Sequence, residues 1–357
     1  MEKIIKDFVG QLKIGKKQSF KNLSMYPLIS DYRVAFDYYT LDEALDKKNI
    51  EILEVDESGS VSDLKVVNKS SMMALILGGE ELVGAKQNRI INTTILVSGN
   101  STIIIPVTCV EQGRWSYDGQ SFSSDELIIP DFLRHDKTQQ NSSSVRVPKA
   151  FYSGELMTPA FLRHDKTRQV SSSVRVQKAF YSDQCAMWSE ISNKSVRHGA
   201  VSPTMDLGEI YEKEKTVLKE YLDGFNNIES QTGAVFMINE EIAGMDCFGK
   251  SETFSSVFHK LVKSYALDAI DWFDNKKEYN VPKSKVTKFL KETSKTNIDT
   301  QKSVGEGIDC RLETKKIAGS ALCYDSQIPH MAVFAESDIG RPNSKMQRFS
   351  RRRNQTL

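Results

Sequence analysis

The sequence predicts one compact α+β domain, with a strand-rich N-terminal half of sandwich or barrel type and a C-terminal half of helices and hairpins. β-Branched residues dominate residues 62–110, and such runs are typical of strands. Apolar residues recur at helical spacing in 207–225 and 254–270. A chain of 357 residues has room for one large domain or two ordinary ones, so a two-lobed arrangement is the alternative.

The N-terminal half opens with a predicted strand over 22–29. Thr40 and Glu43 fit a capping box, in which each side chain bonds to the other residue's backbone amide, so a short helix should follow. Residues 98–101 predict a hairpin turn between two nearly continuous apolar runs, which indicate strands buried on both faces. The further strands are expected at 50–55, 64–67, 72–77, 90–97 and 102–110.

The C-terminal half is expected to be more helical. Asp206 is a candidate N-cap for a helix through Phe225, and Ser251 is one for the most strongly amphipathic helix of the chain. Residues 239–241 predict the turn of a hairpin. The remaining elements expected are a short helix around 286–290 and strands at 308–312, 316–322 and 328–334.

A tandem repeat with a period of 29 residues occupies the middle of the chain, at 130–182. The segment 130–153 recurs as 159–182 with identical residues at 20 of 24 positions. Two copies are too few for a solenoid. Because Ser, Gln, Lys and Arg dominate the segment, at least one copy is expected to be an exposed excursion. His135 and His164 are the same residue in the two copies and are expected to be solvated.

The composition is that of a soluble protein, with 39% hydrophobic and 27% charged residues and a mean hydropathy of −0.41. No apolar run reaches the roughly 18–20 residues that a membrane span needs, and the N-terminus lacks the apolar core of a signal peptide. A cytoplasmic location without membrane contact is therefore expected. The five cysteines form no CxxC pair, which argues against a disulfide framework and against a thiolate zinc site.

Charge is distributed unevenly between the body of the chain and its tail. The segment 341–357 carries +6 while the whole chain carries +1, so the remainder carries −5. We expect an N-terminal segment at 1–21, one domain at 22–337 and a disordered basic tail at 338–357. Nucleic-acid binding is not expected of the acidic body, and weak contact of the tail with nucleic acid or an acidic partner is the alternative. The sequence leaves the oligomeric state open.

Six polar residues crowd between two apolar strands in GGEELVGAKQNR, at 78–89. They are Glu80, Glu81, Lys86, Gln87, Asn88 and Arg89. A polar group buried without a partner costs about 2–7 kcal/mol, so these groups should form an internal network or a ligand site. The two basic residues suit a phosphate or carboxylate, the two amides suit hydroxyls, and either glutamate can act as a base or share a divalent metal. A polar turn with surface ion pairs is the alternative.

A second polar cluster, CVEQGRW, follows the last of these strands directly. Cys109 and Glu111 are two residues apart and share a face if the strand continues. Cys109 can act as a nucleophile only with a depressed pKa, and a thiol buried at the end of a strand is the alternative. Arg114 and Trp115 can stack on a planar ligand or on each other.

A third motif, SDQCAMW at 182–188, adds Gln184 and Trp188. These two residues are four apart and share one face if the segment is helical; packing of Trp188 in the core is the alternative to ligand contact. The sequence contains no P-loop, no GxGxxG after a strand, no GxSxG, no HExxH and no HRD or DFG motif. Those absences remove the commonest kinase, P-loop NTPase, hydrolase and metalloprotease hypotheses.

The motifs GEELVGAKQNR, CVEQGRW, SDQCAMWSEI and GAVFMINEEIAGMDCFGKSETF resemble the ARPP-1 family, named for association with ADP-ribosylglycohydrolase and the rhodanese-phosphatase superfamily. The similarity runs from about Asn22 to Phe334. It implies a protein of NAD and ADP-ribose metabolism that binds or processes an ADP-ribose-like nucleotide. A non-catalytic ligand-binding or protein-interaction module in the same pathway is the alternative. No cofactor follows from it, although a divalent metal is compatible with the carboxylates.

The resemblance also implies a set of site residues. The catalytic candidates are Glu80, Glu81 and Glu111, and the ligand-binding candidates are Lys86, Gln87, Asn88, Arg89, Arg114, Trp115, Gln184 and Trp188. In this hypothesis Trp115 stacks on the base while Lys86 and Arg89 hold the pyrophosphate. The duplication and the basic tail depart from the family pattern. Because the duplication lies just before SDQCAMW, it can displace that motif from the site.

Overall fold

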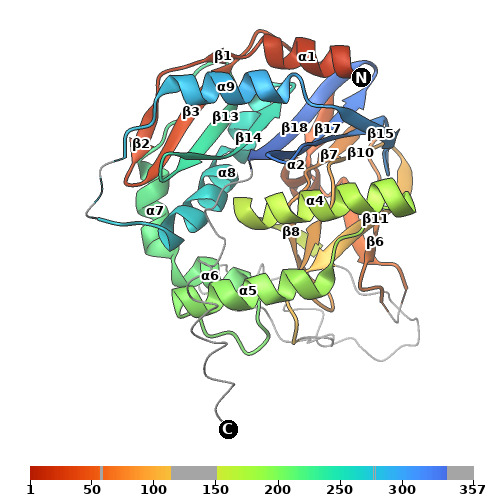
Figure 1. The fold of residues 1–357 in the computed structure, drawn as a ribbon. Coiled ribbons are helices and arrows are strands. Elements are labelled where there is room, and N and C mark those ends of the chain that lie inside the picture. The colour runs from red at the N-terminus through yellow and green to blue at the C-terminus, as the bar shows by residue number, and fades with distance from the viewer. Residues whose placement is uncertain (57–58, 114–150, 276, 278, 336–357) are drawn as a thin grey trace.

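A computed structural model describes residues 1–56, 59–113, 151–275, 277 and 279–335 (Figure 1). Its helices and strands confirm the predicted α+β class. None of the helices within these ranges is long and apolar enough to cross a membrane. The helices are α1 (Glu2–Gly10), α2 (Leu41–Asp46), α4 (Ala160–Gln177), α5 (Gln184–His198), α6 (Gly208–Lys213), α7 (Lys215–Asp223), α8 (Ser251–Asp271) and α9 (Lys283–Thr293).

The described strands come from both ends of the chain. They are β1 (Lys13–Ile14), β2 (Gln18–Phe20), β3 (Leu23–Ile29), β4 (Tyr38–Thr40), β5 (Ile50–Glu54), β6 (Asp63–Asn68), β7 (Met73–Ile76), β8 (Glu80–Gly84), β9 (Arg89–Ile91), β10 (Ile95–Val97), β11 (Ser101–Cys109), β12 (Phe151–Met157), β13 (Gln231–Ile238), β14 (Glu241–Phe248), β15 (Ile298–Lys302), β16 (Ile308–Glu313), β17 (Ile317–Tyr324) and β18 (Gln327–Ala335).

The largest unit is an antiparallel sheet of nine strands in the order β1-β3-β13-β14-β18-β17-β16-β15, with β2 also paired to β3. Helices α1 and α9 lie over one face (Figure 1), where Phe8 and Phe289 pack against Val235. Helices α7 and α8 cover the other face, where Tyr221 and Phe254 share a core with the sheet. Every residue of β13 is buried, because helices cover both faces of the sheet at this strand.

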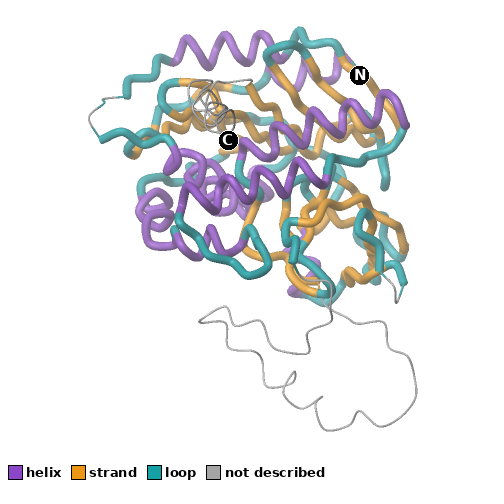
Figure 2. The backbone as a smooth tube through the Cα atoms, turned by 60° about the horizontal axis from the view of Figure 1, so that its bottom comes forward, coloured by secondary structure: helices purple, strands orange, loops and turns teal. Residues whose placement is uncertain are grey.

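The N-terminal half also builds a smaller β unit, which Figure 2 shows set apart from most of the helices. It consists of a three-stranded sheet, β10-β7-β4, and a six-stranded sheet, β12-β8-β9-β11-β6-β5. Together they enclose an aliphatic core that includes Ile52, Leu82 and Val107. This half-barrel is the predicted strand-rich half, and its β8–β9 hairpin carries the GGEELVGAKQNR motif.

Elements that were predicted from local signals are confirmed. The Thr40 hydroxyl accepts a bond from the Glu43 amide, and the Glu43 carboxylate accepts one from the Thr40 amide at 2.8 Å, so the capping box opens α2. Strands β13 and β14 form the expected hairpin, in which Asn239 and Glu240 have φ of 48° and 71°. Positive φ at both turn residues matches the twist of the paired strands. The three strands expected between 308 and 334 are also present.

The predicted strand over 90–97 is wrong, and so is the hairpin that should follow it. The chain forms β9 and β10 in different sheets, and β11 pairs with β6 and β9 instead of β10. The break falls where polar side chains bond to distant buried groups. Thr93 Oγ1 donates to Asp309 at 2.8 Å, and Thr94 Oγ1 lies 2.8 Å from His330 Nδ1. Local composition signalled a strand but not these long-range partners.

Two helix boundaries also differ from the prediction. The helix that was expected to run through Phe225 is divided into α6 and α7 at Glu214, whose φ of −94° and ψ of 7° depart from helical values. Lys250, rather than Ser251, occupies the N-cap of α8, and its side chain makes no capping bond. Helix α1 was not predicted, although its Ile5, Phe8 and Val9 are buried.

The second copy of the repeat forms helix α4, which lies against the nine-stranded sheet. Its Arg163 and Lys166 are almost completely buried, at 2% and 3% exposure. His164 is also buried, with Nδ1 2.9 Å from Asp165, so the expectation that it is solvated is wrong. The polar side chains of α4 are buried because they bond to residues far away in the sequence, and composition alone does not show such partners. His135 and nearly all of the first copy lie outside the described residues.

Deleting residues 122–150, one full period of the repeat, is expected to leave the fold intact. The deletion shortens the connection from Gly113 to Phe151 by 29 residues and retains β12, α4 and α5. Because loop-closure entropy changes slowly with length, the free energy of unfolding should stay within about 1 kcal/mol of the parent value. Denaturant titration followed by circular dichroism measures this value. A loss of several kcal/mol would show that the first copy supports the fold.

Candidate functional site

The β8–β9 hairpin divides the polar motif between two faces. Glu81 lies opposite Ile90, and Leu82 lies opposite Arg89. Because successive side chains of a strand point to opposite faces, Glu81 and Ile90 share one face of the hairpin, and Leu82 and Arg89 share the other. The face with Leu82 packs into the half-barrel interior. The face with Ile90 packs into the core under the helices. At the turn, Gly84 has a φ of 134°, which L side chains rarely adopt. The motif therefore forms two adjacent groups of polar side chains.

The first group is a carboxyl cluster of Glu81, Glu111 and Asp206. Asn88 connects two of its members: its backbone amide donates to Glu111 Oε2 at 3.1 Å, and its Nδ2 donates to Asp206 Oδ1 at 3.0 Å. Glu81 is completely buried, and neither of its carboxylate oxygens has a hydrogen-bond partner among the described residues. Such a group is costly to bury, and it is the clearest chemical anomaly in the site.

Burial and mutual repulsion set the protonation of this cluster. Burial, followed by the charges of Asp206 and Glu111, raises the pKa of Glu81 well above the ordinary value for glutamate. Burial, followed by the charge of Glu111, raises the pKa of Asp206 to about 6. Neighbouring carboxyls whose pKa values are raised in this way can exchange protons near neutral pH. Of the two, Asp206 changes charge near pH 6, and Glu81 holds its proton to a higher pH than an ordinary glutamate does.

The carboxyl cluster is expected to make the protein less stable as the pH rises. Because the folded-state pKa values of Glu81 and Asp206 are raised, the folded chain holds more protons than the unfolded chain between about pH 4 and those folded-state values, so raising the pH favours unfolding. The contribution of Asp206 is therefore complete below its unfolded pKa and is lost as the pH rises through about 6.

Melting temperatures of the parent, Glu81→Gln and Asp206→Asn at pH 4.5 and pH 8 measure this dependence. Asp206→Asn should gain stability relative to the parent at the higher pH, since the neutral amide removes a buried charge that the parent carries above about pH 6. Glu81→Gln should show a smaller difference, because Glu81 keeps its proton over more of this range. An identical difference at both pH values would contradict the proposed protonation.

The second group lies on the other face of the hairpin, around Lys86 and Arg89, which are 7% and 0% exposed. Arg89 Nη1 donates to Gln87 Oε1 at 3.2 Å, and its Nη2 donates to the Ser60 carbonyl at 3.5 Å. The Lys86 amide donates to Glu54 Oε1 at 3.4 Å. Burying a guanidinium costs free energy that hydrogen bonds must offset, and these two bonds from Arg89 do so in the half-barrel interior. Arg89 is therefore part of the half-barrel interior, and Lys86 is the more exposed of the two cations.

Glu80 is separated from both groups. Its Oε2 accepts from the Leu77 amide at 2.8 Å, and its Oε1 accepts from Lys260 Nζ at 3.2 Å. Lys260 also pairs with Asp42. Burial raises the pKa of Glu80 despite the opposing charge of Lys260. The structure thus places Glu80 in an ion network that connects β8 to α8 and α2, away from the carboxyl cluster.

The remaining predicted residues surround the end of β11. Gln184 bonds to both backbone groups of Cys109, accepting from its amide at 2.8 Å and donating to its carbonyl at 2.7 Å. Burial raises the pKa of the Cys109 thiol to about 11, which favours the buried-thiol alternative over a nucleophile. Trp188 is half-buried on α5, as the helical spacing predicted. The predictions for Arg114 and Trp115 lie outside the described residues.

Sequence reasoning missed several polar partners because they are distant along the chain. Local patterns indicate Asp206 only as a helix cap and Glu54 only as one residue of a strand. A third network joins Arg163 to Asp246, which also accepts from the Tyr265 hydroxyl at 2.9 Å. The one local signal was Asp246 itself, an acid at the end of an apolar strand.

Within the described part of the chain, no group of three or more His, Cys, Asp or Glu side chains has the geometry to hold a metal ion. A family model described as the ARG and Rhodanese-Phosphatase-superfamily-associated Protein domain, ARPP-1, matches residues 11–153 and 146–334. The two matched ranges overlap within the repeat. Neither a curated protein nor a solved structure gives a significant match.

Proposed function

This chain belongs to the ARPP-1 family, and from that membership we propose that it binds and processes an ADP-ribose-like nucleotide at the β8–β9 hairpin. The family name associates its members with ARG and rhodanese-phosphatase-superfamily proteins. An ADP-ribosylglycohydrolase releases ADP-ribose, so a protein that acts beside it has this nucleotide available. The name supports only the pathway; the proposed ligand and the reaction depend on the chemistry of the site.

The observation that carries the proposal is Glu81, a fully buried carboxyl with both oxygens unbonded among the described residues and a raised pKa. In this proposal the protonated Glu81 donates its proton to a leaving oxygen. Glu111 or Asp206 takes the proton of the attacking water, so the step is a hydrolysis with water as the only co-reactant. General acid–base catalysis of this kind typically contributes about 10²–10⁴ in rate.

Ligand recognition is assigned to the turn. Lys86 supplies positive charge for a pyrophosphate, and Asn88 is placed between two carboxyls that can accept bonds from ribose hydroxyls. Arg89, which is fully buried, is a positioning residue in this proposal: it fixes Gln87 and the turn. This assignment changes the initial hypothesis, in which Arg89 contacted the phosphate directly.

A non-catalytic ligand-binding module is the second candidate. It is favoured by the internal hydrogen bonds that Asn88, Gln87 and Arg89 already make. Polar groups that bond to one another keep the site rigid and leave fewer of them to act on a ligand. In that case the carboxyl cluster binds ribose without transferring protons.

A thermal-shift screen of the full chain with NAD, ADP-ribose, cyclic ADP-ribose and nucleotide phosphates, with and without a divalent metal, tests the proposal. We expect ADP-ribose or a close analogue to raise the melting temperature, because a ligand that binds only the folded state stabilises it. Chromatography of the same mixtures then shows whether the ligand is consumed. A stabilising ligand that remains intact supports the binding module, and the absence of any shift contradicts both candidates.

A further inference from the structure

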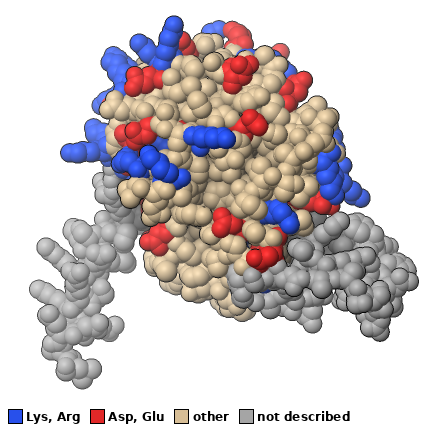
Figure 3. Space-filling view, turned by 90° about the vertical axis from the view of Figure 1, so that its right-hand side faces the viewer, with Lys and Arg blue, Asp and Glu red and all other residues tan. Residues whose placement is uncertain are grey.

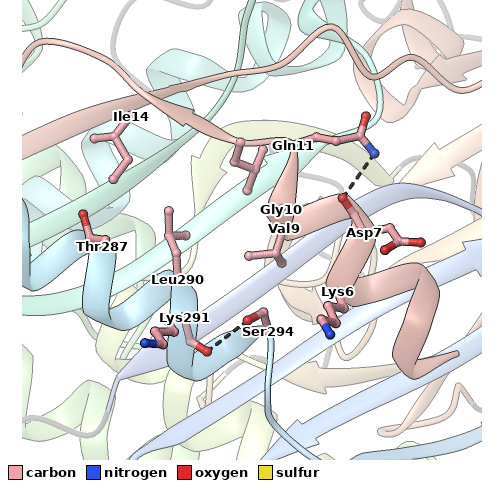
Figure 4. A pocket seen from close by; sticks show the side chains of 11 residues that line it. Lys6, Asp7, Val9, Gly10, Gln11, Ile14, Thr287, Leu290, Lys291 and Ser294 are labelled. Carbon is pink, nitrogen blue, oxygen red and sulfur yellow. Dashed lines mark hydrogen bonds between the residues drawn. The ribbon is translucent and has the colours of Figure 1, made fainter.

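A groove of about 750 Å³ opens between α1 and α9, on the opposite face of the large sheet from α8 (Figure 4). Val9, Leu12 and Leu290, which are mostly buried, give it an apolar lining, and Figure 4 shows Ile14 at one end. Its volume is within the range of sites that hold ligands of drug-like size. The β8–β9 hairpin contributes nothing to its lining, so its function is separate from the proposed nucleotide site.

The surroundings of this groove are basic, although the carboxylate of Asp7 on α1 also lines it. Lys6 and Lys291 line it from the two helices, and Figure 4 shows them at the same end. Neither lysine forms an ion pair with any residue in the described ranges. The bordering segments 1–17 and 283–294 contain nine lysines and three acids. In Figure 3, Lys and Arg side chains project at the top of the molecule, the end where Figure 1 places α1 and α9, with some acids among them.

We propose that this groove docks an acidic amphipathic helix of a partner protein, with apolar residues on the floor and carboxylates facing Lys6 and Lys291. Burial of apolar side chains supplies affinity in such helix-in-groove contacts, and complementary charge supplies orientation and a faster association rate. The basic tail of this chain, with six basic residues and no acid between 341 and 357, is excluded as the occupant by like charge. The same basic surface on a second copy is excluded for the same reason.

The edge of the neighbouring sheet favours a helix over an added strand as the docked form. Strand β1 has only two residues, and Lys283 Nζ already donates to the Ile14 carbonyl at 2.9 Å. Short edge strands that carry lysines discourage pairing with another chain. The partner is therefore expected to lie between the two helices instead of extending the sheet.

The test uses the full chain and a fluorescein-labelled peptide of about 12 residues, with Leu at i, i+3, i+4 and i+7 and Glu elsewhere. Fluorescence anisotropy should show saturable binding that weakens as salt is added. The double variant Lys6→Glu, Lys291→Glu should lose at least about tenfold in affinity. A β-carbon at Gly10, which lines the groove, would have no atom within 4 Å, so Gly10→Trp should fill the groove and abolish binding without disturbing the fold.

The matched control is Lys3→Glu with Lys288→Glu, which changes the same number of charges on the same two helices outside the groove lining. It should retain most of the affinity. An equal loss in the control, no peptide binding by the parent, or unchanged binding by Gly10→Trp would overturn the proposal. Tighter binding to phosphatidylserine vesicles than to the peptide, unaffected by Gly10→Trp, would assign the basic surface to membranes instead. Matching melting temperatures show that each variant is folded.

Discussion

Arg163→Met is expected to lower the free energy of unfolding by about 3–5 kcal/mol, the typical cost of removing one partner of a buried ion pair. Arg163 and Asp246 are 2% and 0% exposed and form a direct salt bridge between α4 and β14. Burial alone would raise the pKa of Asp246, but Arg163 and His330 hold it at about 2. Methionine keeps much of the side-chain volume, so the decrease in the free energy of unfolding should come mainly from the unpaired Asp246 carboxylate and only to a small extent from a cavity.

The matched control is Arg175→Met on the same helix, because Arg175 is about half exposed and pairs with Asp299 at 3.3 Å and Glu313 at 2.6 Å. Surface pairs of that kind contribute about 0–1 kcal/mol. Adding Asp246→Asn to Arg163→Met should recover part of the loss, since the buried charge is then removed. Urea titrations of the four proteins measure these values. A loss below about 1 kcal/mol in Arg163→Met would show that α4 is not anchored through this pair.

Glu81→Gln is expected to reduce consumption of the stabilising nucleotide by at least about 100-fold while leaving its affinity within a few fold of the parent value. The amide matches the carboxyl in shape, but it is not acidic and cannot transfer a proton to a leaving oxygen. A reduction in turnover without a change in affinity is the mark of an interaction made only in the transition state. Because a buried, unbonded carboxyl is replaced by a neutral group, the variant should be at least as stable as the parent near neutral pH.

The control for this prediction is Glu51→Gln on β5, where the glutamate pairs with Lys69 at the surface, 2.6 Å away. Quantitative chromatography of product against time measures turnover, and calorimetry measures affinity. Loss of affinity together with turnover in Glu81→Gln would assign Glu81 to ligand binding. Full activity in Glu81→Gln would remove it from the reaction.

The sequence predicted the elements that depend on neighbours along the chain. The capping box at Thr40, the hairpin at Asn239 and the amphipathic helix α8 follow from local rules of hydrogen bonding and periodicity. The same rules missed the break after Ile91. Its cause is a set of bonds from 92–94 to residues more than 80 positions away, and no periodicity reports such partners.

Local rules also predicted the candidate site only in outline, because some of its partners are distant along the chain. Crowding of charges beside apolar strands indicated buried polar groups in GGEELVGAKQNR, and Glu81 and Glu111 do lie in one cluster. Strand alternation did not indicate that Glu80 would pair with Lys260, which is 180 residues away. Asp206 joins the cluster only because the chain following α5 returns to the end of β11, where the Leu207 amide bonds the Val110 carbonyl.

The most direct measurement is isothermal titration calorimetry of ADP-ribose into the full chain and into Lys86→Met, with Lys69→Met as the surface control. The proposed site predicts saturable single-site binding by the parent and the control, and a loss of about 10- to 100-fold in affinity for Lys86→Met, since a hydrogen bond to a charged group contributes about 1.5–3 kcal/mol. Equal affinity in all three proteins, or no heat of binding in the parent, would contradict a nucleotide site at the β8–β9 hairpin.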